Sequence, residues 1–530
     1  MMRLYFLFAV FCATLTVKAV LTPSSDSSAI VTIDTLAASI ALPDTAVLDT
    51  TAWFGKYLGF KQPKCLPHDA FAPTYGVGNR ARPWRAAAEV TAINLGVWGF
   101  DRYVLNAEFA HVTARSIERN FEHGMVWDND KFSTNLFAHP YHGSLYFNAA
   151  RANGMSFWTS VPYAAMGSLM WEFLAEREPP AINDFIATTM GGVALGEVTN
   201  RFSLLAIDES ERGGARVARE ALAFLVSPMR GLNRLISGDM WRVKHRHYKY
   251  HNLYELPVHA SLGGGLRYLA SGRNLFLGEY VPYVNVNLSY GDPFRKRKQK
   301  PYDYFTLNAM FNLASNQPLI SEVNLTAQLW SRPFEVGQEV DAVVGIYQHF
   351  NYFDSEPVLK HSEAVPFRIG ETAAVGPGII FRIDKPQAFA QIEQRAFATA
   401  ILLGGSLSDY YDVIDRNYNM GSGYSLQSAT DLTFRNGARL SLHFQHFHIF
   451  TYKGYTDEAL NTLNPLYLNT QGDKGHARLT VAHLALRLPL AAGFSLGADT
   501  QFYQRRTHYT YRDDVEHRTF ETRVGLYLHF

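Results

Sequence analysis

Apolar and polar side chains alternate along most of the C-terminal half of the chain. Val284, Val286 and Leu288 alternate with asparagine and serine, and similar alternation returns in 322–330 and 482–490. Successive side chains of a β-strand point to opposite faces, so each of these segments has one oily and one polar surface. The pattern therefore predicts a sheet with a distinct inside and outside.

About twelve such segments can be counted, and twelve is an even number, as closed bacterial barrels require. Their predicted bounds are 254–270, 275–291, 303–315, 320–336, 339–353, 367–384, 388–411, 418–436, 438–453, 476–491, 494–512 and 516–530. Aromatic residues make up 14% of the chain, yet the mean hydropathy is only -0.12. This combination is typical of strands that face lipid at alternate positions. A soluble β-sandwich would show the same alternation and is the alternative fold.

Short turns alternate with longer connections between these segments, as in outer-membrane barrels. The short turns are "EVGQE", "DKPQA", "RNGA" and "AAGF", and the longer connections lie near 354–366, 411–418 and 454–475. The alternation puts the C-terminus on the short-turn side, which faces the periplasm in such barrels. The basic connection "GDPFRKRKQKP" at 291–301 is longer than this scheme expects. It is interpreted as a solvated loop, or as a contact for acidic helical residues or anionic headgroups.

The last predicted strand carries large apolar side chains at alternate positions and ends in Phe530. This ending resembles the C-terminal signal of bacterial outer-membrane proteins, which implies that the barrel-assembly machinery is a partner. The fold prediction is therefore an α+β membrane protein in which a helical module precedes a transmembrane barrel at 250–530. Outer-membrane lipids are the second expected partner.

The N-terminus predicts export. Residues 1–19 combine one arginine, a short apolar run and a small-residue exit, which indicates a signal peptide rather than an anchor helix. Residues 20–80 are interpreted as a flexible N-terminal segment and linker. Only Cys65 remains after processing, so no internal disulfide is expected. The net charge of +1 gives no reason to expect nucleic-acid binding.

Helical spacing replaces strand spacing in a module at 81–240. The expected helices are 84–107, 113–123, 130–153, 156–176, 180–205 and 214–236. Segments 157–174 and 182–200 are apolar but carry small polar or acidic residues, and a charge at the centre of a bilayer helix costs about 3 kcal/mol. A more hydrophobic helix would also stop the chain in the inner membrane. These helices are therefore expected to pack on one another or on the barrel.

The segment beginning "FAHPYHGSLYFNAARANG" resembles a bacterial family known as domain of unknown function family 3943, over roughly residues 95–210. The residues that carry the resemblance are His139, Pro140, Gly143, Ser144, Ala150, Arg151, Gly154, Ser168, Trp171, Glu172, Glu176, Asp184, Thr188, Gly192, Gly196 and Glu197. The resemblance implies an outer-membrane or periplasmic protein of Gram-negative bacteria. It assigns no activity and no catalytic residue.

Polar residues of this segment are the candidate site. Glu172 and Glu176 share a helix face, and with His139 and Asp184 they suggest a hydrolytic centre, for which His139, Glu172 and Asp184 are the catalytic candidates. The alternative is a ligand-binding or structural polar network, whose further members are Ser144, Arg151, Ser168, Glu176, Thr188 and Glu197. Gly191 and Gly192 either bend their helix or let another helix approach closely.

No cofactor or metal site is expected. The pairs His245/His247 and His446/His448 each supply only two ligands, and no zinc-binding pattern completes them. The leading hypothesis is an outer-membrane barrel of unestablished activity, with a helical module that faces the periplasm or occludes the lumen. The alternatives are a membrane-embedded hydrolase acting on lipid or envelope substrates, and a narrow plugged transport pore.

Overall fold

The computed structural model describes much of residues 81–529. The residues outside the description are 1–80, 128–129, 210, 244–256, 273–275, 296–298, 338, 359–363, 387, 413–415, 453, 457, 459–461, 463–471 and 530. The predicted signal peptide, the 20–80 segment, His245, His247 and Phe530 thus lie outside the described residues.

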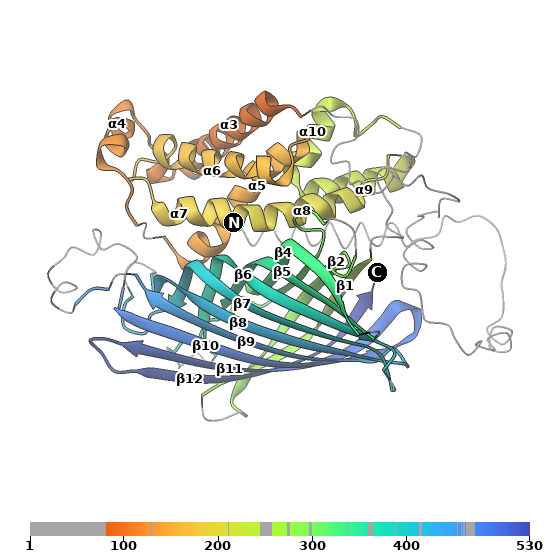
Figure 1. Ribbon diagram of the computed structural model, residues 1–530. Coiled ribbons are helices and arrows are strands. Elements are labelled where there is room, and N and C mark those ends of the chain that lie inside the picture. The colour runs from red at the N-terminus through yellow and green to blue at the C-terminus, as the bar shows by residue number, and fades with distance from the viewer. Residues whose placement is uncertain are drawn as a thin grey trace.

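Twelve strands form one closed antiparallel barrel, in which each strand pairs with the next and β12 pairs with β1 (Figure 1). The strands are β1 (Val258–Ser271), β2 (Gly278–Tyr290), β3 (Phe305–Asn312), β4 (Ile320–Val336), β5 (Val340–Asp354), β6 (Arg368–Asp384), β7 (Phe389–Leu407), β8 (Tyr418–Phe434), β9 (Arg439–Thr451), β10 (Gly475–Pro489), β11 (Phe494–Tyr509) and β12 (Val515–His529). The predicted barrel is confirmed, and the sandwich alternative is wrong.

Short turns gather at one end of the barrel, which we call the short-turn rim, and the long connections gather at the other, the long-loop rim. Two of the short turns contain Gly337 and Gly437, with φ of 70° and 83°. Only glycine adopts this left-handed conformation at little cost, so these residues let the strands reverse tightly. The connection at 291–304 is the long exception at the short-turn rim, as the sequence indicated.

Alternate residues of each strand face the lumen and the exterior. On β9 and β10, Ser441, His443 and His483 line the lumen. On β9 and β10, Leu442, Phe444 and Leu484 point outward and remain exposed. The barrel therefore has the polar inside and oily outside expected of a transmembrane barrel.

The N-terminal part forms helices. They are α3 (Pro83–Phe100), α4 (Ala114–His123), α5 (His139–Ala152), α6 (Phe157–Leu174), α7 (Ile182–Ile186), α8 (Gly192–Ala206), α9 (Gly213–Val226) and α10 (Pro228–Ser237), with π-helical turns at Asp101–Leu105, Thr134–Ala138 and Ala187–Gly191. The single helix expected at 214–236 is interrupted, because Pro228 lacks an N–H group and starts α10. None of the described helices is both long and apolar enough to cross a bilayer.

The helices lie on the outside of the barrel wall (Figure 1). Leu325, Ala327 and Phe350 point away from the lumen, yet each is 0% exposed because it belongs to a core shared with the helical residues Leu136 and Phe147. For the described helices, the predicted lumen-occluding position is therefore wrong. Strand periodicity shows that a face is oily, but it does not show whether lipid or a helix covers that face.

One helical stretch spans the height of the wall. Residues 182–206 run continuously through α7, a π-helical turn and α8, about 37 Å at the helical rise per residue. Near the long-loop rim, Asn183 Nδ2 donates to Asn135 Oδ1 (3.2 Å), and Asn135 Nδ2 donates to the Tyr418 hydroxyl (2.7 Å). Near the short-turn rim, Arg201 holds the barrel connection 291–304. The module is thus fixed at both ends of the barrel.

Two glycines allow α5 and the 182–206 helix to cross with their backbones in contact. A Cβ atom at Gly143 would lie 1.8 Å from the Thr188 carbonyl oxygen, and one at Gly192 would lie 2.5 Å from the Gly143 carbonyl carbon. A larger residue at either position would collide with backbone atoms, which move only if the helices separate. Close approach therefore accounts for Gly192, beside the π-helical turn that ends at Gly191.

Candidate functional site

The structure brings two of the three catalytic candidates together. His139 Nε2 lies 3.5 Å from Asp184 Oδ1 and 3.9 Å from Asp130 Oδ2. Glu172 Oε2 instead accepts a hydrogen bond from the Ala181 backbone N–H at 2.8 Å. Glu172 and Asp184 are only 1% and 3% exposed. A substrate has no open access to these carboxylates, so their geometry suits a buried network better than a catalytic cleft.

Arg151 and Glu197 form a second cluster near the opposite rim. Arg151 donates to both carboxylate oxygens of Glu197, through Nε at 2.7 Å and Nη2 at 3.0 Å. Arg201 Nε donates to Glu197 at 2.9 Å, and Arg201 Nη1 reaches Asp303 Oδ1 at 3.1 Å. Residues 184 and 197 are about 20 Å apart along their helix. The candidate residues thus form two clusters.

The remaining candidates are dispersed through the module. Ser144 Oγ donates to the Tyr141 carbonyl oxygen at 2.6 Å, and Glu176 accepts a hydrogen bond from Trp171 Nε1. Ser168 Oγ is buried and makes no hydrogen bond among the described residues. The carbonyl of Thr188 lies against Gly143 at the helix crossing. These side chains converge on no common point.

The connection 291–304 meets α8 through an acidic side chain and a backbone carbonyl. Arg201 of α8 donates to Asp303 and to the Pro301 carbonyl oxygen, the latter at 2.8 Å. The expected contact of the basic stretch with acidic helical residues stays a prediction, because residues 296–298 lie outside the described residues. The arginine comes from the helix and the carboxylate from the barrel. Periodicity could not reveal this, because it does not show which residues of a connection turn inward.

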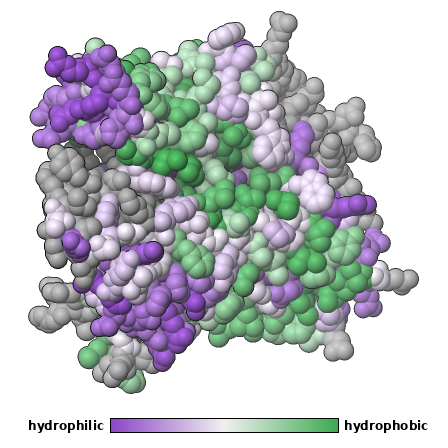
Figure 2. Space-filling view, turned by 60° about the vertical axis from the view of Figure 1, so that its left-hand side comes forward, coloured by the Kyte–Doolittle hydropathy of each residue, from purple (hydrophilic) through white to green (hydrophobic). Residues whose placement is uncertain are grey.

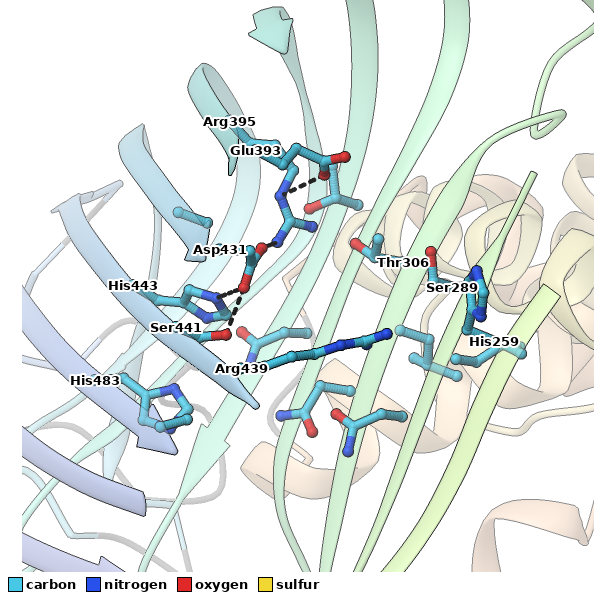
Figure 3. A pocket seen from close by; sticks show the side chains of 18 of the residues that line it. His259, Ser289, Thr306, Glu393, Arg395, Asp431, Arg439, Ser441, His443 and His483 are labelled. Atoms are coloured by element: carbon cyan, nitrogen blue, oxygen red, sulfur yellow. Dashed lines mark hydrogen bonds and ion pairs between the residues drawn. The ribbon is translucent and has the colours of Figure 1, made fainter. Parts of the chain in front are cut away.

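The lumen contains a chamber of about 690 Å³ that the sequence did not predict (Figure 3). It extends from residues of the short-turn rim, among them His259, Arg439 and His529, to Glu322 and Arg523 near the middle of the barrel. Most of its wall consists of inward-facing strand residues, among them Asn285, Asn324 and Gln445, and the wall presents both polar and apolar groups. We call this space the lumen chamber.

Two histidines lie side by side on the chamber wall, each next to an aspartate. His443 and His483 are register partners on β9 and β10, with ring centroids 5.4 Å apart. His483 Nε2 lies 3.1 Å from Asp499 Oδ1, and His443 Nε2 lies 3.5 Å from Asp431 Oδ1 (Figure 3). The odd numbers of His443 and Gln445 place both inward on β9. The sequence could indicate that these residues face inward, because they alternate with outward apolar residues. Only the strand register shows that His443, His483 and their two aspartates lie together.

The arginines of the chamber differ in their partners. Arg382, Arg395, Arg487 and Arg523 each have a carboxylate within 4.0 Å, supplied by Asp292, Asp431, Asp499 and Glu322 respectively. Among the described residues, no carboxylate is found within that distance of Arg439. Its side chain extends across the chamber toward His259 and Ser289 (Figure 3). Arg439 is therefore the cation that the chamber offers to a ligand.

Buried side chains close the lumen beyond the chamber. Arg267 Nη2 donates to Glu521 at 2.8 Å, Glu521 also pairs with Arg523 at 2.7 Å, and Arg523 reaches Glu322 on β4 at 3.1 Å. An apolar cluster that includes Tyr503 follows toward the long-loop rim. These side chains are almost completely buried, so the chamber ends at this layer in the structure.

Purified protein is expected to pass no stepwise current in a planar lipid bilayer, because this layer separates the two rims. Replacing both Arg267 and Glu521 with alanine removes two of its four charged side chains and is expected to produce conductance steps. Single-channel recording of both proteins tests the layer. Stepwise current through the unaltered protein, of the size seen with open porins, would show that the lumen is continuous.

The described histidine pair His446/His448 faces away from the lumen. His448 Nε2 lies 3.0 Å from His476 Nδ1 on the neighbouring strand, and the ring of His448 stacks on Phe450. Within the described part of the chain, no group of three or more His, Cys, Asp or Glu residues is arranged to hold a metal ion. The pair is thus part of an aromatic row on the barrel surface.

About half of the chain is similar in structure to the NanC porin (9% identity, TM-score 0.25, covering 50% of this chain and 98% of that one). It is also similar to OmpT of Vibrio cholerae (8%, 0.22, 52% and 97%) and OprD of Pseudomonas aeruginosa (9%, 0.18, 52% and 94%). No match was found among curated proteins. Residues 124–229 match the model of a domain of unknown function, DUF3943. This chain thus combines a segment that matches DUF3943 with a closed twelve-stranded antiparallel barrel.

Proposed function

We propose that this protein resides in the outer membrane of a Gram-negative bacterium with its short-turn rim in the periplasm. The closed barrel, its outward oily side chains and the position of the short turns support this orientation. The last strand pairs with β1 up to His529, as expected of a strand that the barrel-assembly machinery delivers. In this orientation the lumen chamber opens toward the periplasm.

Binding of a small anion in the lumen chamber is the function that the geometry supports best. The observation that carries this proposal is Arg439: no carboxylate of the described residues lies within 4.0 Å of it, whereas every other chamber arginine has one. A volume of about 690 Å³ lies within the usual range of small-molecule sites. A carboxylate or phosphate group would accept charge-assisted hydrogen bonds from the guanidinium, and these are among the stronger hydrogen bonds in proteins.

The surroundings of Arg439 favour an anion over a cation. The chamber carboxylates Asp431 and Asp499 are already engaged by arginine and histidine side chains. His259 and His529 line the same rim and add ring N–H groups that can donate hydrogen bonds. Because low-dielectric walls surround the lumen, a charge here acts more strongly than it would in bulk water. A cation would meet Arg439 without a free carboxylate to offset it.

Titration calorimetry with sodium phosphate and sodium acetate, at constant ionic strength, tests the proposal. R439Q is expected to weaken binding at least about tenfold, because a hydrogen bond to a charged group contributes about 1.5–3 kcal/mol. The control is R506Q, since Arg506 lies on the exposed outer face of β11 beside Glu516. Equal binding by R439Q and unaltered protein, or equally tight binding of choline, would contradict the proposal.

A further inference from the structure

Helix α6 buries polar side chains and exposes large apolar ones. On α6 the buried positions include Ser160, Ser168 and Glu172, whereas Trp158 and Met166 are exposed. A helix on the surface of a water-soluble protein shows the opposite arrangement, with apolar residues toward the core. The outer face of α6 was therefore selected for contact with something other than water.

Helix α3 repeats this arrangement beside α6. Trp84 and Leu95 are 87% and 61% exposed, whereas Asn94 is buried and donates to the Gly167 carbonyl oxygen of α6 at 3.0 Å. The charged residues of α3 are Arg85 and Glu89, which pair with each other at 3.0 Å. The charged residue of α6, Glu172, is buried. The outward surfaces of the two helices thus form an apolar face, which we call the outer helical face.

The dimensions of this face match a bilayer. Each helix has 18 residues, a length of about 27 Å, against a hydrocarbon thickness of about 30 Å. Phe157, at the start of α6, packs on Tyr302 of the connection at the short-turn rim. Beyond the other end of α6, Val126 bonds to Pro180 and Ile182, and the adjacent Trp127 packs on Tyr452 near the long-loop rim. The helix therefore runs along the height of the wall.

The outer helical face also continues the surface of the barrel. Figure 2 shows hydrophobic residues over much of the helical part and over the barrel below it, while the α4 corner at the upper left is hydrophilic. The interior contacts follow the pattern of helices in membranes, where small residues such as Gly143, Gly167 and Gly192 let helices approach closely. The apolar face and the small-residue contacts are independent observations.

We propose that the outer helical face contacts the acyl chains of the outer membrane, so that the helical module is embedded in the bilayer beside the barrel. In this arrangement one side of the helical module packs on the barrel wall, and the other side contacts lipid. This arrangement explains why no described helix is apolar enough to cross alone: the polar side chains are satisfied within the module and against the barrel. The proposal is independent of anion binding in the lumen chamber.

Spin labels at single cysteines test the proposal in vesicles of phosphatidylethanolamine and phosphatidylglycerol. In a chain with Cys12→Ser and Cys65→Ser, the labelled variants are L95C on α3 and M166C on α6. Matched references are L484C, on the exposed outer face of β10, and E118C, on the exposed surface of α4. At positions 95 and 166 the ratio of oxygen to nickel-complex collisions is expected to resemble that at 484 and to exceed that at 118 several-fold.

Three results would overturn the proposal. A ratio at 95 and 166 equal to that at 118 would place the outer helical face in water. Exclusion of both probes would mean that protein covers it. Dipolar broadening between labels would identify a second copy of the chain as the partner. Because all four substitutions lie on exposed surfaces, the barrel is expected to fold in each variant, which its heat-modifiable migration in electrophoresis checks.

Discussion

Replacing Glu197 with glutamine is expected to lower the free energy that holds the helical module on the barrel by about 3–5 kcal/mol. Glu197 is fully buried and bonds to both Arg151 and Arg201. The substitution removes the carboxylate charge between two buried guanidinium groups, and the loss of one partner from such a pair is costly. The measurement is the urea dependence of protease resistance in the helical region, in purified protein.

The matched control is E516Q, which removes a carboxylate from an exposed cluster with Arg506 and Arg518 on the barrel surface. Solvent and salt screen such pairs, so the urea midpoint of the helical region should not change. A midpoint for E197Q equal to that of the unaltered protein would mean that the buried cluster does not fix the module.

G143A is expected to destabilise the docked module by at least about 3 kcal/mol, near the upper end of the usual cost of overpacking a core. The added methyl group would lie 1.8 Å from the Thr188 carbonyl oxygen. The obstacle is backbone, so no rotamer change relieves it and the two helices must separate. Far-ultraviolet circular dichroism and proteolysis of the helical region, both against urea, measure the effect.

G96A provides a control of identical chemistry, because an added Cβ at Gly96 of α3 meets no atom within 4 Å. It should leave stability unchanged or raise it by up to about 1 kcal/mol, since alanine favours the helix more than glycine does. Equal effects of G143A and G96A would show that the close crossing contributes nothing beyond helix propensity.

The strands were predictable from sequence because apolar and polar residues alternate within each strand, and this pattern needs no information from the rest of the chain. β4 occupies 320–336 as predicted, whereas β7 stops at Leu407, before the predicted end at 411. What covers the outward residues was not predictable. Leu325, which is buried beneath helices, and Leu484, which is exposed, lie in the same kind of alternating segment. The alternation shows only that both side chains point away from the lumen, and it does not show whether a helix or lipid covers them.

The candidate site was less predictable because its contacts join distant parts of the chain. Arg151 and Glu197 were both identified, but their direct pairing depends on how α5 crosses α8. Arg439, His443 and His483 were missed, since each looks like one polar residue among many on a strand. Only the register of closed strands places them around one chamber. The sequence shows which side chains are polar or charged, but it does not show which of them lie together around the lumen chamber.

The junction between β1 and β12 is left uncovered by the helices. Leu266, Val524 and Leu526 along that junction remain more than half exposed, and the two strands pair from Ser261–His529 to Ser271–Thr519. Strand β12 can therefore pair with β1 and close the barrel after the helices have packed against the other strands, because no helix has to move to make room. If β1 and β12 pair last, the helical module and the barrel of one chain would enter the membrane together.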